Sequence, residues 1–453
     1  MLTLNQLKTL YTNSPLWLKK LYASIPYEIR NGTDYRKWKK FLEKEINTEE
    51  YQLLKLKETI FYAYENTLFY KNVFDQLGCN IHDFNDLKDV EMLPLIDKDT
   101  VREYYDDMIA KSYPQKKTFF VTTGGSSGEP MQFLQSKNVW NKEWAFGFNL
   151  FSKYGYFPKM LKASFRGGDF TGLKKDIYWK YNPMHHELHF SPFALNFDTV
   201  KFYVNELNMQ QPLVYHSYPS SLLLLINCMQ EMNLVLDYRP RLIILISENY
   251  SKIDIETINH FFQCQVISFY GHSEHLIFAP TIDKELAQYQ IDKRYGFCEL
   301  VDSENKTITH NLTKGELVGT SFDNFAMPLI RYKTNDYASY IDYENAVIGT
   351  IEGRWKQEFL DGYNGSKIYL TALNMHSDIF TNVVQFQFIQ KVVGQVDFLV
   401  IPKSEFKTID EENILKAFRN KVDNAIEFNL IKVNKLVLTE RGKVKKIIKE
   451  YNK

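Results

Sequence analysis

The segment from Arg241 to Leu276 constrains the fold more strongly than any other part of the sequence. It predicts a buried strand from Arg241 to Ile246, a helix, and a second buried strand from Gln265 to Tyr270. Ser251 and Asp254 have the spacing of a helix cap pair, and the apolar positions of one helical face follow at Ile255, Ile258 and Phe262. Two strands joined by a helix run parallel, so their carboxyl ends meet at one edge of the sheet, where open α/β sheets bind ligands.

The sequence around this segment predicts a large domain followed by a small one. Residues 1–116 have the dense charge and the apolar spacing of helices. The middle of the chain alternates β-branched and aromatic runs with helical segments, as in a mixed or parallel sheet covered by helices. We therefore expect a large α/β domain over residues 1–353 and a small α+β domain over 354–453. In the small domain the pattern predicts strands at 383–390, 396–402 and 431–438 and a helix at 411–422.

The charge balance and the cysteines exclude several classes of protein. Lysine plus arginine and aspartate plus glutamate both number 55, so the chain lacks the overall positive field of a dedicated nucleic-acid binder. The 4 cysteines lie far apart without a C-x-x-C pair, so we expect neither a zinc knuckle nor a disulfide framework. The first residues lack the apolar run of a signal peptide, and no apolar stretch could span a bilayer. We expect a cytoplasmic protein without membrane insertion.

A glycine- and serine-rich loop follows the strand predicted from Thr118 to Val121. Its glycines permit positive φ angles and close approach, so successive backbone N–H groups could surround phosphates. The loop lacks the lysine and the following helix of a Walker loop, and an ordinary hairpin turn fits it as well. Its residues are Thr122, Thr123, Gly124, Gly125, Ser126, Ser127 and Gly128.

The turns after the two strands of the first segment carry polar and aromatic groups. A tyrosine ring there could stack on a nucleotide base, and a carboxylate could hold Mg²⁺ together with phosphate oxygens. Ordinary strand-end turns with solvated charges are the alternative. The candidates are Ser247, Glu248, Tyr270, Gly271 and Glu274.

Three later segments could complete a nucleotide site. Asp336 stands at what we expect to be a strand terminus, where a carboxylate can accept hydrogen bonds from two ribose hydroxyls or cap a turn. Arg354 and Lys356 lie at the composition change and could form a hinge that carries a ribose or phosphate ligand. Gly442 and Lys443 open a lysine-rich end, and such ends are usually solvated.

Two segments that contain histidine leave alternatives open. The first, His216 to Tyr218, includes Ser217 and precedes a buried helix, so it could line a substrate pocket or pack in the interior. The second is bracketed by prolines, has no cysteine nearby and does not form the H-E-x-x-H zinc motif. Whether its histidines bind a metal stays open; they are His185, His186 and His189.

Together these segments resemble the adenylate-forming superfamily of acyl-CoA ligases, and in detail its phenylacetate–CoA ligase group with the CapK-like members from capsular polysaccharide loci. TTGGSSGEP resembles the superfamily's phosphate loop, SFYGHSEH its Tyr-Gly-x-x-Glu motif, and PLIRYKTND its Arg-Tyr-x-Thr-Gly-Asp motif. EGRWKQ resembles its Gly-Arg hinge, and RGK stands in the place of its terminal Ser-Gly-Lys. The motifs follow in this order from Thr122 to Lys443. The resemblance implies an α/β fold with a large multi-sheet amino-terminal domain and a small mobile carboxyl-terminal domain.

The resemblance also implies a role for each matching residue. Thr123 to Gly128 would hold the β and γ phosphates of ATP, in a site that includes Ser247, Glu248 and Gly271. Tyr270 would stack on adenine, Glu274 would help to bind Mg²⁺, and Asp336 would hold the ribose. Arg354 would contact ribose or α-phosphate, and Lys356 would mark the hinge. Lys443 would touch the acid's carboxylate and the α-phosphate.

The chain departs from the superfamily pattern at two places. Thr334, Asn335 and Asp336 stand where the pattern has Thr-Gly-Asp. Asparagine tolerates the left-handed conformation better than most residues, so the turn can persist. Met131 follows Pro130 where a lysine is frequent, which leaves pyrophosphate with one fewer counter-charge.

The activity that the resemblance implies is ATP-dependent conversion of a small carboxylic acid into its acyl adenylate. The acyl group would then pass to CoA, a carrier-protein thiol or a sugar amine, in a setting such as surface polysaccharide synthesis. An aryl- or fatty-acyl-CoA ligase of catabolism and a non-catalytic nucleotide-binding scaffold are the alternatives. The sequence names neither the acid, the acceptor nor the oligomeric state.

Overall fold

The computed structural model describes residues 10–11, 14–78, 83–123, 131–167, 170, 173–248, 250–352, 359–363, 366–369, 380, 382–422, 425–439, 442 and 444–451. The chain forms two compact units. Unit 1 consists of Met1–Pro158, Pro183–His185 and Ser268–Glu352, and unit 2 of Lys159–Asn182, His186–Ile267 and Gly353–Lys453. Each unit combines segments that lie far apart in the sequence. The division into domains at Gly353 stays a prediction.

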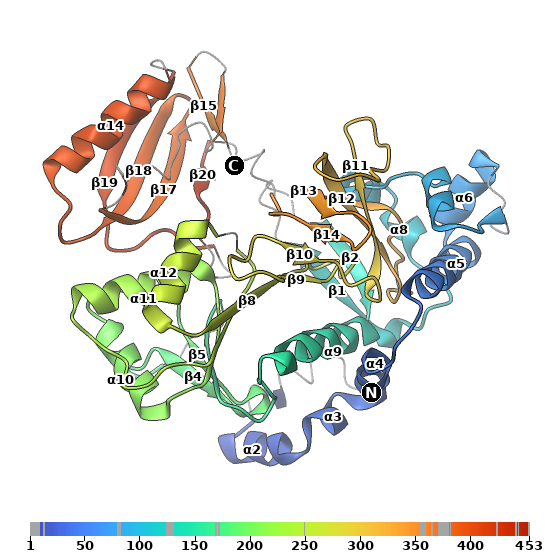
Figure 1. Ribbon diagram of the computed structural model, residues 1–453, viewed down its shortest axis with the longest axis horizontal. Coiled ribbons are helices and arrows are strands. Elements are labelled where there is room, and N and C mark those ends of the chain that lie inside the picture. Colours follow the sequence, from blue (N-terminus) through green and yellow to red (C-terminus); the bar gives the residue numbers. More distant parts are fainter. Residues whose placement is uncertain are drawn as a thin grey trace. The chain divides into compact units, whose positions relative to one another are not determined.

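The amino-terminal part of unit 1 is helical, as its charge and apolar spacing predicted (Figure 1). Asn47 accepts a hydrogen bond from the backbone N–H of Glu50 and caps the 19-residue helix α5, and Gly78 ends α6 at φ 64°. The helices are α2 (Leu16–Ser24), α3 (Tyr27–Arg30), α4 (Gly32–Leu42), α5 (Thr48–Asn66), α6 (Leu68–Leu77), η2 (Leu87–Met92), α7 (Lys98–Glu103), α8 (Tyr105–Met108) and η3 (Gln115–Lys117). None of the helices in the described part of the chain has the length and apolar character needed to span a membrane.

Unit 1 also contains a hairpin and a five-stranded antiparallel sheet. The hairpin pairs β1 (Thr118–Thr123) with β2 (Met131–Ser136), which confirms the predicted succession of strand, loop and strand. The sheet has the order β10-β14-β13-β12-β11. Its strands are β10 (Tyr289–Gln290), β11 (Gly296–Val301), β12 (Lys314–Ser321), β13 (Tyr332–Asp342) and β14 (Val347–Ile348), and α9 (Asn138–Lys153) packs against α4 in the same unit.

A buried ion pair anchors the start of β13. The guanidinium of Arg331 donates to both carboxylate oxygens of Glu299 on β11, from Nε at 2.7 Å and from Nη2 at 3.0 Å. Its Nη1 donates to the carbonyl of Leu93 at 2.7 Å, and Thr307 Oγ1 donates to Glu299 at 2.9 Å. The two side chains are only 4% and 3% exposed. The pair therefore ties β11, the segment after η2 and the residue before β13 together.

Unit 2 is built on a largely parallel sheet. The order β4-β5-β3-β6-β7 continues into β8, whose last three residues belong to unit 1 and pair there with β9 (Ala279–Pro280). β3, β5, β6 and β7 run parallel, and β4 is an antiparallel edge strand. The bounds are β3 (Lys162–Phe165), β4 (Trp179–Asn182), β5 (Glu187–Phe190), β6 (Val214–Ser217), β7 (Leu242–Leu245) and β8 (Gln265–Tyr270). The two strands predicted from the first segment are thus confirmed as β7 and β8.

Three helices pack beside this sheet (Figure 1). They are α10 (Val200–Gln210), α11 (Pro219–Glu231) and α12 (Lys252–Phe262). The predicted cap of α12 is present, because Ser251 accepts from Asp254 N while the Asp254 carboxylate accepts from Ser251 N. The three apolar positions predicted on one face of α12 are all buried. Aromatic rings join the helices to one face of the sheet: Tyr203 to Phe190 at 5.5 Å and Phe262 to Tyr215 at 5.5 Å between centroids.

The carboxyl-terminal part of unit 2 forms a second sheet, of order β19-β18-β17-β20, with α14 across it (Figure 1). Phe388 and Phe398 meet at 4.7 Å, Phe398 and Phe418 at 5.0 Å, and Phe418 and Phe428 at 4.8 Å, which fixes the helix on the sheet. The elements are β17 (Val383–Val392), β18 (Gln395–Pro402), α14 (Thr408–Val422), β19 (Glu427–Lys432) and β20 (Ile447–Lys449), beside the small pair β15 (Phe359–Asp361) and β16 (Lys367–Tyr369).

The predicted position of one strand in this part was wrong. We expected a strand at 431–438, whereas β19 covers Glu427–Lys432. Phe428 and Leu430 are buried between exposed neighbours, so the period-two burial begins earlier than the apolar run suggested. Leu438 forms an isolated bridge with Val444. The other two predicted strands and the helix are confirmed.

We expect Arg331→Met to lower the free energy of unfolding by about 3–5 kcal/mol, because it leaves the Glu299 carboxylate buried without its counter-charge. The double variant Arg331→Met with Glu299→Leu should recover much of that loss, since it removes both charges. Urea denaturation followed by tryptophan fluorescence measures the change.

The control is Arg102→Met, which removes a partly exposed arginine, 31% exposed, that pairs at 2.9 Å with Asp99, itself 85% exposed. This change should cost no more than about 1 kcal/mol, the usual range of a surface pair. Equal losses for the two arginines would show that the buried pair does not anchor β13.

Candidate functional site

Several predicted site residues lie outside the described part of the chain. They are Gly124, Gly125, Ser126, Ser127, Gly128, Arg354, Lys356 and Lys443. Thr123 is the last residue of β1 and pairs with Met131 of β2. The roles of all these residues in phosphate binding, hinge motion and catalysis stay predictions.

Asp336 lies in a bulge within β13. We expected it at a strand terminus, and this was wrong, because β13 continues to Asp342. Between the pairs Glu316 with Tyr337 and Val318 with Lys333, β13 has three residues where β12 has one. Asn335 adopts φ 61°, so the prediction that asparagine sustains the turn in place of glycine is confirmed.

Side-chain hydrogen bonds hold this bulge in shape. Thr334 Oγ1 donates to the carbonyl of Leu317 at 2.8 Å and accepts from the backbone N–H of Asp336 at 3.2 Å. The backbone N–H of Asn335 donates to Glu316 Oε1 at 2.9 Å. The extra residues are therefore fixed, and the bulge re-aims the Asp336 side chain away from the regular pleat.

The bulge and the end of β8 bring two predicted site residues together. The hydroxyl of Tyr270 donates to Asp336 Oδ2 at 2.7 Å. Burial, with the nearby Asp336 charge adding to it, raises the pKa of the Tyr270 hydroxyl well above its ordinary value, so it remains a donor. The Tyr270 ring is only partly covered and meets His272 edge to face at 5.6 Å. This pair places an aromatic ring beside a carboxylate.

Glu274 follows β8 in the same unit and is 6% exposed. Its Oε1 accepts from the Tyr332 hydroxyl at 3.4 Å, and that hydroxyl also lies 3.7 Å from Met131 Sδ. Glu274 is thus a buried carboxylate between β13 and the strand that follows the glycine- and serine-rich loop. Sequence reasoning selected Glu274 but had no means of finding its contact with Tyr332.

Ser247 and Glu248 follow β7 in unit 2. Ser247 adopts φ 64°. The carboxylate of Glu248 accepts from the backbone N–H of Ser220 at 3.1 Å, at the start of α11, and from that of Val444 at 3.3 Å. Glu248 therefore connects the carboxyl edge of the parallel sheet with the segment that carries the terminal lysine motif. Its expected role in nucleotide binding stays a prediction.

Gly442 packs tightly against the same sheet edge. It is buried at φ 73°, and a Cβ placed on it would lie 3.0 Å from Pro192 Cγ, 3.1 Å from Gly167 Cα and 3.2 Å from Phe193 Cζ. A side chain therefore fits neither the backbone conformation nor the space. Gly442 and Val444 flank Lys443, so the residues on both sides of the lysine contact the carboxyl ends of parallel strands.

Of the residues expected to line a substrate pocket, His216 and Ser217 lie on opposite faces of β6, and Tyr218 follows that strand. Ser217 Oγ donates to the carbonyl of Tyr218 at 2.9 Å and the carbonyl of Phe165 lies 3.3 Å away, so this hydroxyl is engaged in the turn into α11. Tyr218 is 6% exposed. His216 pairs in register with Ser164 and therefore lies on the opposite face from Ser217. A role for these residues in substrate binding stays a prediction.

The three histidines of the proline-bracketed segment are engaged separately. His185 stacks on Trp144 at 5.8 Å between centroids in unit 1. In unit 2, a ring nitrogen of His186 lies 2.7 Å from the carbonyl of Lys159, and one of His189 lies 2.9 Å from that of Arg166. In the ranges that the structure describes, no cluster of histidine, cysteine and acidic side chains could hold a metal ion.

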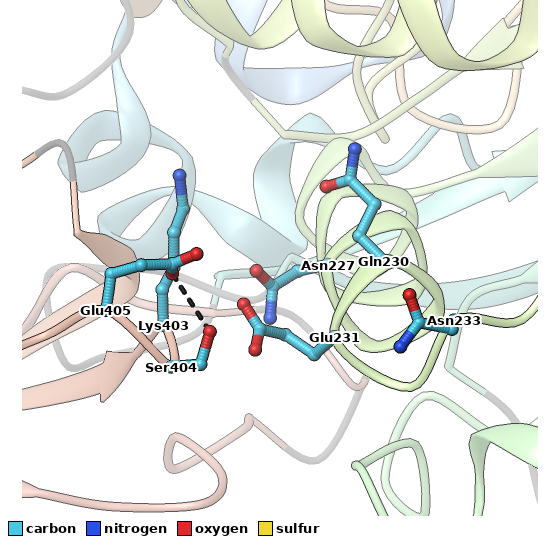
Figure 2. A pocket seen from close by; sticks show the side chains of 7 residues that line it. All are labelled: Asn227, Gln230, Glu231, Asn233, Lys403, Ser404 and Glu405. Carbon is cyan, nitrogen blue, oxygen red and sulfur yellow. Dashed lines mark hydrogen bonds between the residues drawn. The ribbon is translucent and has the colours of Figure 1, made fainter.

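A polar pocket of about 430 Å³ lies in unit 2 and contains none of the predicted residues (Figure 2). It lies between the end of α11 and the turn after β18, where Ser404 Oγ donates to Glu405 at 3.0 Å. No motif marked these residues in the sequence, because amides and charges at a helix end are typical of any surface. The lining residues are Asn227, Gln230, Glu231, Asn233, Lys403, Ser404 and Glu405.

Comparison with known proteins gives a family match and two relatives. Residues 361–450 match the family described as the CapK C-terminal domain. The chain is 25% identical to protein CapK of Staphylococcus aureus, over 96% of this chain and 98% of CapK. It is 21% identical to the phenylacetate-coenzyme A ligase of Escherichia coli strain K12, over 74% of this chain and 76% of the ligase.

Crystal structures of 2-hydroxyisobutyryl-CoA ligase share the fold. With R3-HIB-AMP in the postadenylation state the TM-score is 0.66 at 16% identity, over 89% of this chain and 90% of that one. With 2-HIB-AMP and CoA in the thioesterification state the TM-score is 0.56 at 16% identity, over 89% of each chain. The expected α/β fold, with a large multi-sheet amino-terminal domain and a small carboxyl-terminal domain, is confirmed. The chain is therefore a CapK-like protein that is related to the phenylacetate-coenzyme A ligases.

Proposed function

We propose that this protein uses ATP to activate a small carboxylic acid as its acyl adenylate and then transfers the acyl group to an acceptor. The observation that carries the proposal is the hydrogen-bonded pair of Tyr270 and Asp336, which joins the two motifs that resemble the superfamily's nucleotide site. The structures of 2-hydroxyisobutyryl-CoA ligase support it, because they hold acyl adenylates.

In the first step, an oxygen of the acid's carboxylate attacks the α-phosphorus of ATP, and the bond to the leaving pyrophosphate breaks. In the second step, the acceptor attacks the acyl carbon, loses its proton and releases AMP. Two anions meet in the first step, so catalysis depends on positioning and on neutralising charge. Tyr270 would bind adenine, Asp336 the ribose hydroxyls, and residues 123–128 the β and γ phosphates. Lys443 would bind the α-phosphate and the acid, and Arg354 would contact the ribose or the α-phosphate.

Glu274 fits the role of the Mg²⁺ ligand. It supplies one buried carboxylate close to β2, and Mg²⁺ in nucleotide sites usually takes one or two carboxylates together with phosphate oxygens. When bound, the ion would neutralise phosphate charge. The Tyr332 hydroxyl would orient the Glu274 carboxylate toward it.

CoA is the acceptor that we propose first. The second structure of 2-hydroxyisobutyryl-CoA ligase holds CoA beside the adenylate, and the name of the E. coli relative includes coenzyme A. The alternative is transfer to a carrier thiol or a sugar amine in surface polysaccharide synthesis, and it rests on the similarity to CapK. The cytoplasm is the compartment we propose, because it supplies both ATP and CoA.

Exchange of labelled pyrophosphate into ATP, driven by added acid, tests the first step. Lys443→Ala should lower the exchange rate about 10²–10³-fold, because it removes one charge-neutralising donor. Transfer of the acyl group from a preformed adenylate to CoA should largely persist. Single-turnover assays separate the two steps, and equal loss of both would contradict the role of Lys443. Retained ATP binding without exchange for any acid would favour the scaffold alternative.

The nucleotide pair can be tested by calorimetric titration with ATP. Tyr270→Ala should weaken binding by roughly tenfold to a hundredfold, the usual effect of losing one stacked aromatic ring. Tyr270→Phe should bind ATP nearly as well as the natural protein, since it keeps the ring and loses only the bond to Asp336. Equal affinities for the natural protein and Tyr270→Ala would place adenine elsewhere.

Gly442→Ala tests whether the segment around Lys443 must contact the sheet edge. The added methyl group would press on Gly167 and Pro192, so exchange should fall by roughly tenfold to a hundredfold, as for a misplacement of about 1 Å. Gly155→Ala is the matched control, because Gly155 has φ 77° but no atom within 4 Å of an added Cβ. Both variants carry the same backbone strain, so an equal effect on exchange would exclude the packing explanation.

A further inference from the structure

One face of the parallel sheet in unit 2 carries a group of ionisable side chains on β3, β5 and β6, beside the buried apolar residues Val214, Leu242 and Ile244. The register pairs Lys162 of β3 with Glu187 of β5, and Ser164 with both His189 of β5 and His216 of β6. Residues that face each other in register point to the same side of a sheet, so these five side chains share one face. Parallel strands covered by helices usually read as continuous apolar runs. On β3 and β5 the ionisable residues Lys162, Glu187 and His189 interrupt such runs.

The opposite face shows what ordinary packing looks like in the same strands. Phe165 stacks on Phe190 at 5.0 Å, and helices α10 and α12 cover these rings through Tyr203 and Phe262. Helices α10 and α12 thus pack against that face of the sheet. The polar side chains of the other face take no part in these ring contacts.

The polar face has more positive than negative charge. Lys162 Nζ lies 3.8 Å from Glu187 Oε1, and Arg166 Nη2 lies 3.0 Å from the same oxygen. Two cations therefore share one carboxylate, which is 1% exposed. Lys162 is 5% exposed, while Arg166, just after the end of β3, keeps 33% exposure.

One N–H donor of Arg166 also has no acceptor in the described part of the chain. Its Nε is buried and has no hydrogen-bond partner among the residues that the structure describes. A buried N–H group without an acceptor is energetically unfavourable, so such groups usually face a ligand or a water molecule. The partly exposed guanidinium could hold a carboxylate or phosphate through two parallel hydrogen bonds.

The pKa values of the neighbouring groups are consistent with this excess of positive charge. Burial, together with the charges of Lys162 and Arg166, holds the pKa of His216 well below its ordinary value. Burial and Arg166 likewise lower the pKa of His189. Although burial opposes its ionisation, Lys162 and Arg166 hold the pKa of Glu187 well below its usual range. The face resists a further cation and favours an anion.

This face ends where the segment around Lys443 contacts the sheet. Gly167, next to Arg166, lies against Gly442. The carbonyl of Arg166 is in hydrogen-bond contact with His189, which fixes the backbone at this point. An acid bound beside Gly442 would therefore lie close to Arg166 and the polar face.

We infer that Arg166, together with Lys162 and the two histidines, binds a second anionic group on the acid substrate. This rests on the proposed acid activation and names its substrate class: an acid with a further carboxylate or phosphate, instead of an uncharged arylacetic or fatty acid. Arg166 makes the direct contact through its free Nε–H and the exposed edge of its guanidinium. Lys162 keeps the site positive while Glu187 orients Arg166.

The substrate class is tested by acid-dependent exchange of pyrophosphate into ATP. The panel contains dicarboxylates of increasing length, a phosphorylated hydroxy acid, and uncharged monoacids such as butyrate and phenylacetate. An acid with a second anionic group should give the highest kcat/KM. The dicarboxylate and phosphate arms distinguish the two sources of charge. A preference for an uncharged acid would overturn the inference while leaving acid activation intact.

Arg166→Met should raise KM for the preferred acid by about 10- to 100-fold, with little change in kcat or in ATP affinity. Arg166→Lys keeps the charge beside Glu187 but lacks the planar fork, so it should fold normally and recover only part of the affinity. Arg241→Met is the matched control, because Arg241 is an exposed arginine just before β7, at the amino edge of the same sheet.

Calorimetric titration of the acids without ATP tests the subsite independently of turnover. Weaker binding of the charged acid to Arg166→Met than to Arg241→Met would support the subsite. If no acid drives exchange, that result would contradict the proposed function but would not by itself contradict the subsite. Equal binding to the two variants would overturn the subsite. If Arg166→Met lost ATP affinity but kept its affinity for the acid, Arg166 would contact a nucleotide phosphate. That result would also overturn the proposed subsite.

Discussion

The buried pair of Arg331 and Glu299 is the interaction on which the candidate nucleotide site depends. It anchors the residue before β13 to β11 and to the segment after η2, through hydrogen bonds from Nε, Nη1 and Nη2 of the guanidinium. Tyr332 and Asp336 lie one and five residues further along the same strand. The pair therefore sets where the bulge begins, and the bulge sets where the Asp336 carboxylate points.

The bulge itself shows how a departure from the superfamily pattern is accommodated. Glycine is usual at the central position because its backbone reaches the left-handed region without strain. Asn335 takes the same conformation at φ 61°, and Glu316 accepts its backbone N–H. The geometry that brings Asp336 to Tyr270 is thus kept with the help of a hydrogen bond from the neighbouring strand β12, where the pattern relies on the absence of a side chain.

In unit 2 the carboxyl edge of the parallel sheet gathers the features of functional interest. Glu248 after β7 accepts from Val444, Gly442 lies against Gly167 after β3, and Arg166 stands between that contact and the polar face. Parallel strands place all their carboxyl ends at one edge, so loops from distant parts of the chain meet there. Among relatives with so little sequence identity, residues at this edge can differ and change the acid that is bound, while the fold persists.

Local patterns in the sequence were sufficient for most elements and for part of the site. The strands β7 and β8, the cap of α12, the hairpin of β1 and β2, and the left-handed Asn335 each depend on residues close together in the chain. The position of β19 was misjudged, because an apolar run at 431–438 does not show which side chains the rest of the sheet can bury.

Contacts between distant residues were decided by the tertiary structure. Tyr270 and Asp336 are 66 positions apart, Arg331 and Glu299 are 32, and Glu248 and Val444 are 196. No motif singled out Arg166, since an arginine at a strand end is typical of a solvated surface, and only the strand order places it beside Glu187 and the two histidines. The sequence by itself determined which segments are helices, strands and glycine-rich turns, because backbone preference and burial period are local. Which charges face one another was decided by the sheet register, because pairing between strands depends on residues far apart in the chain.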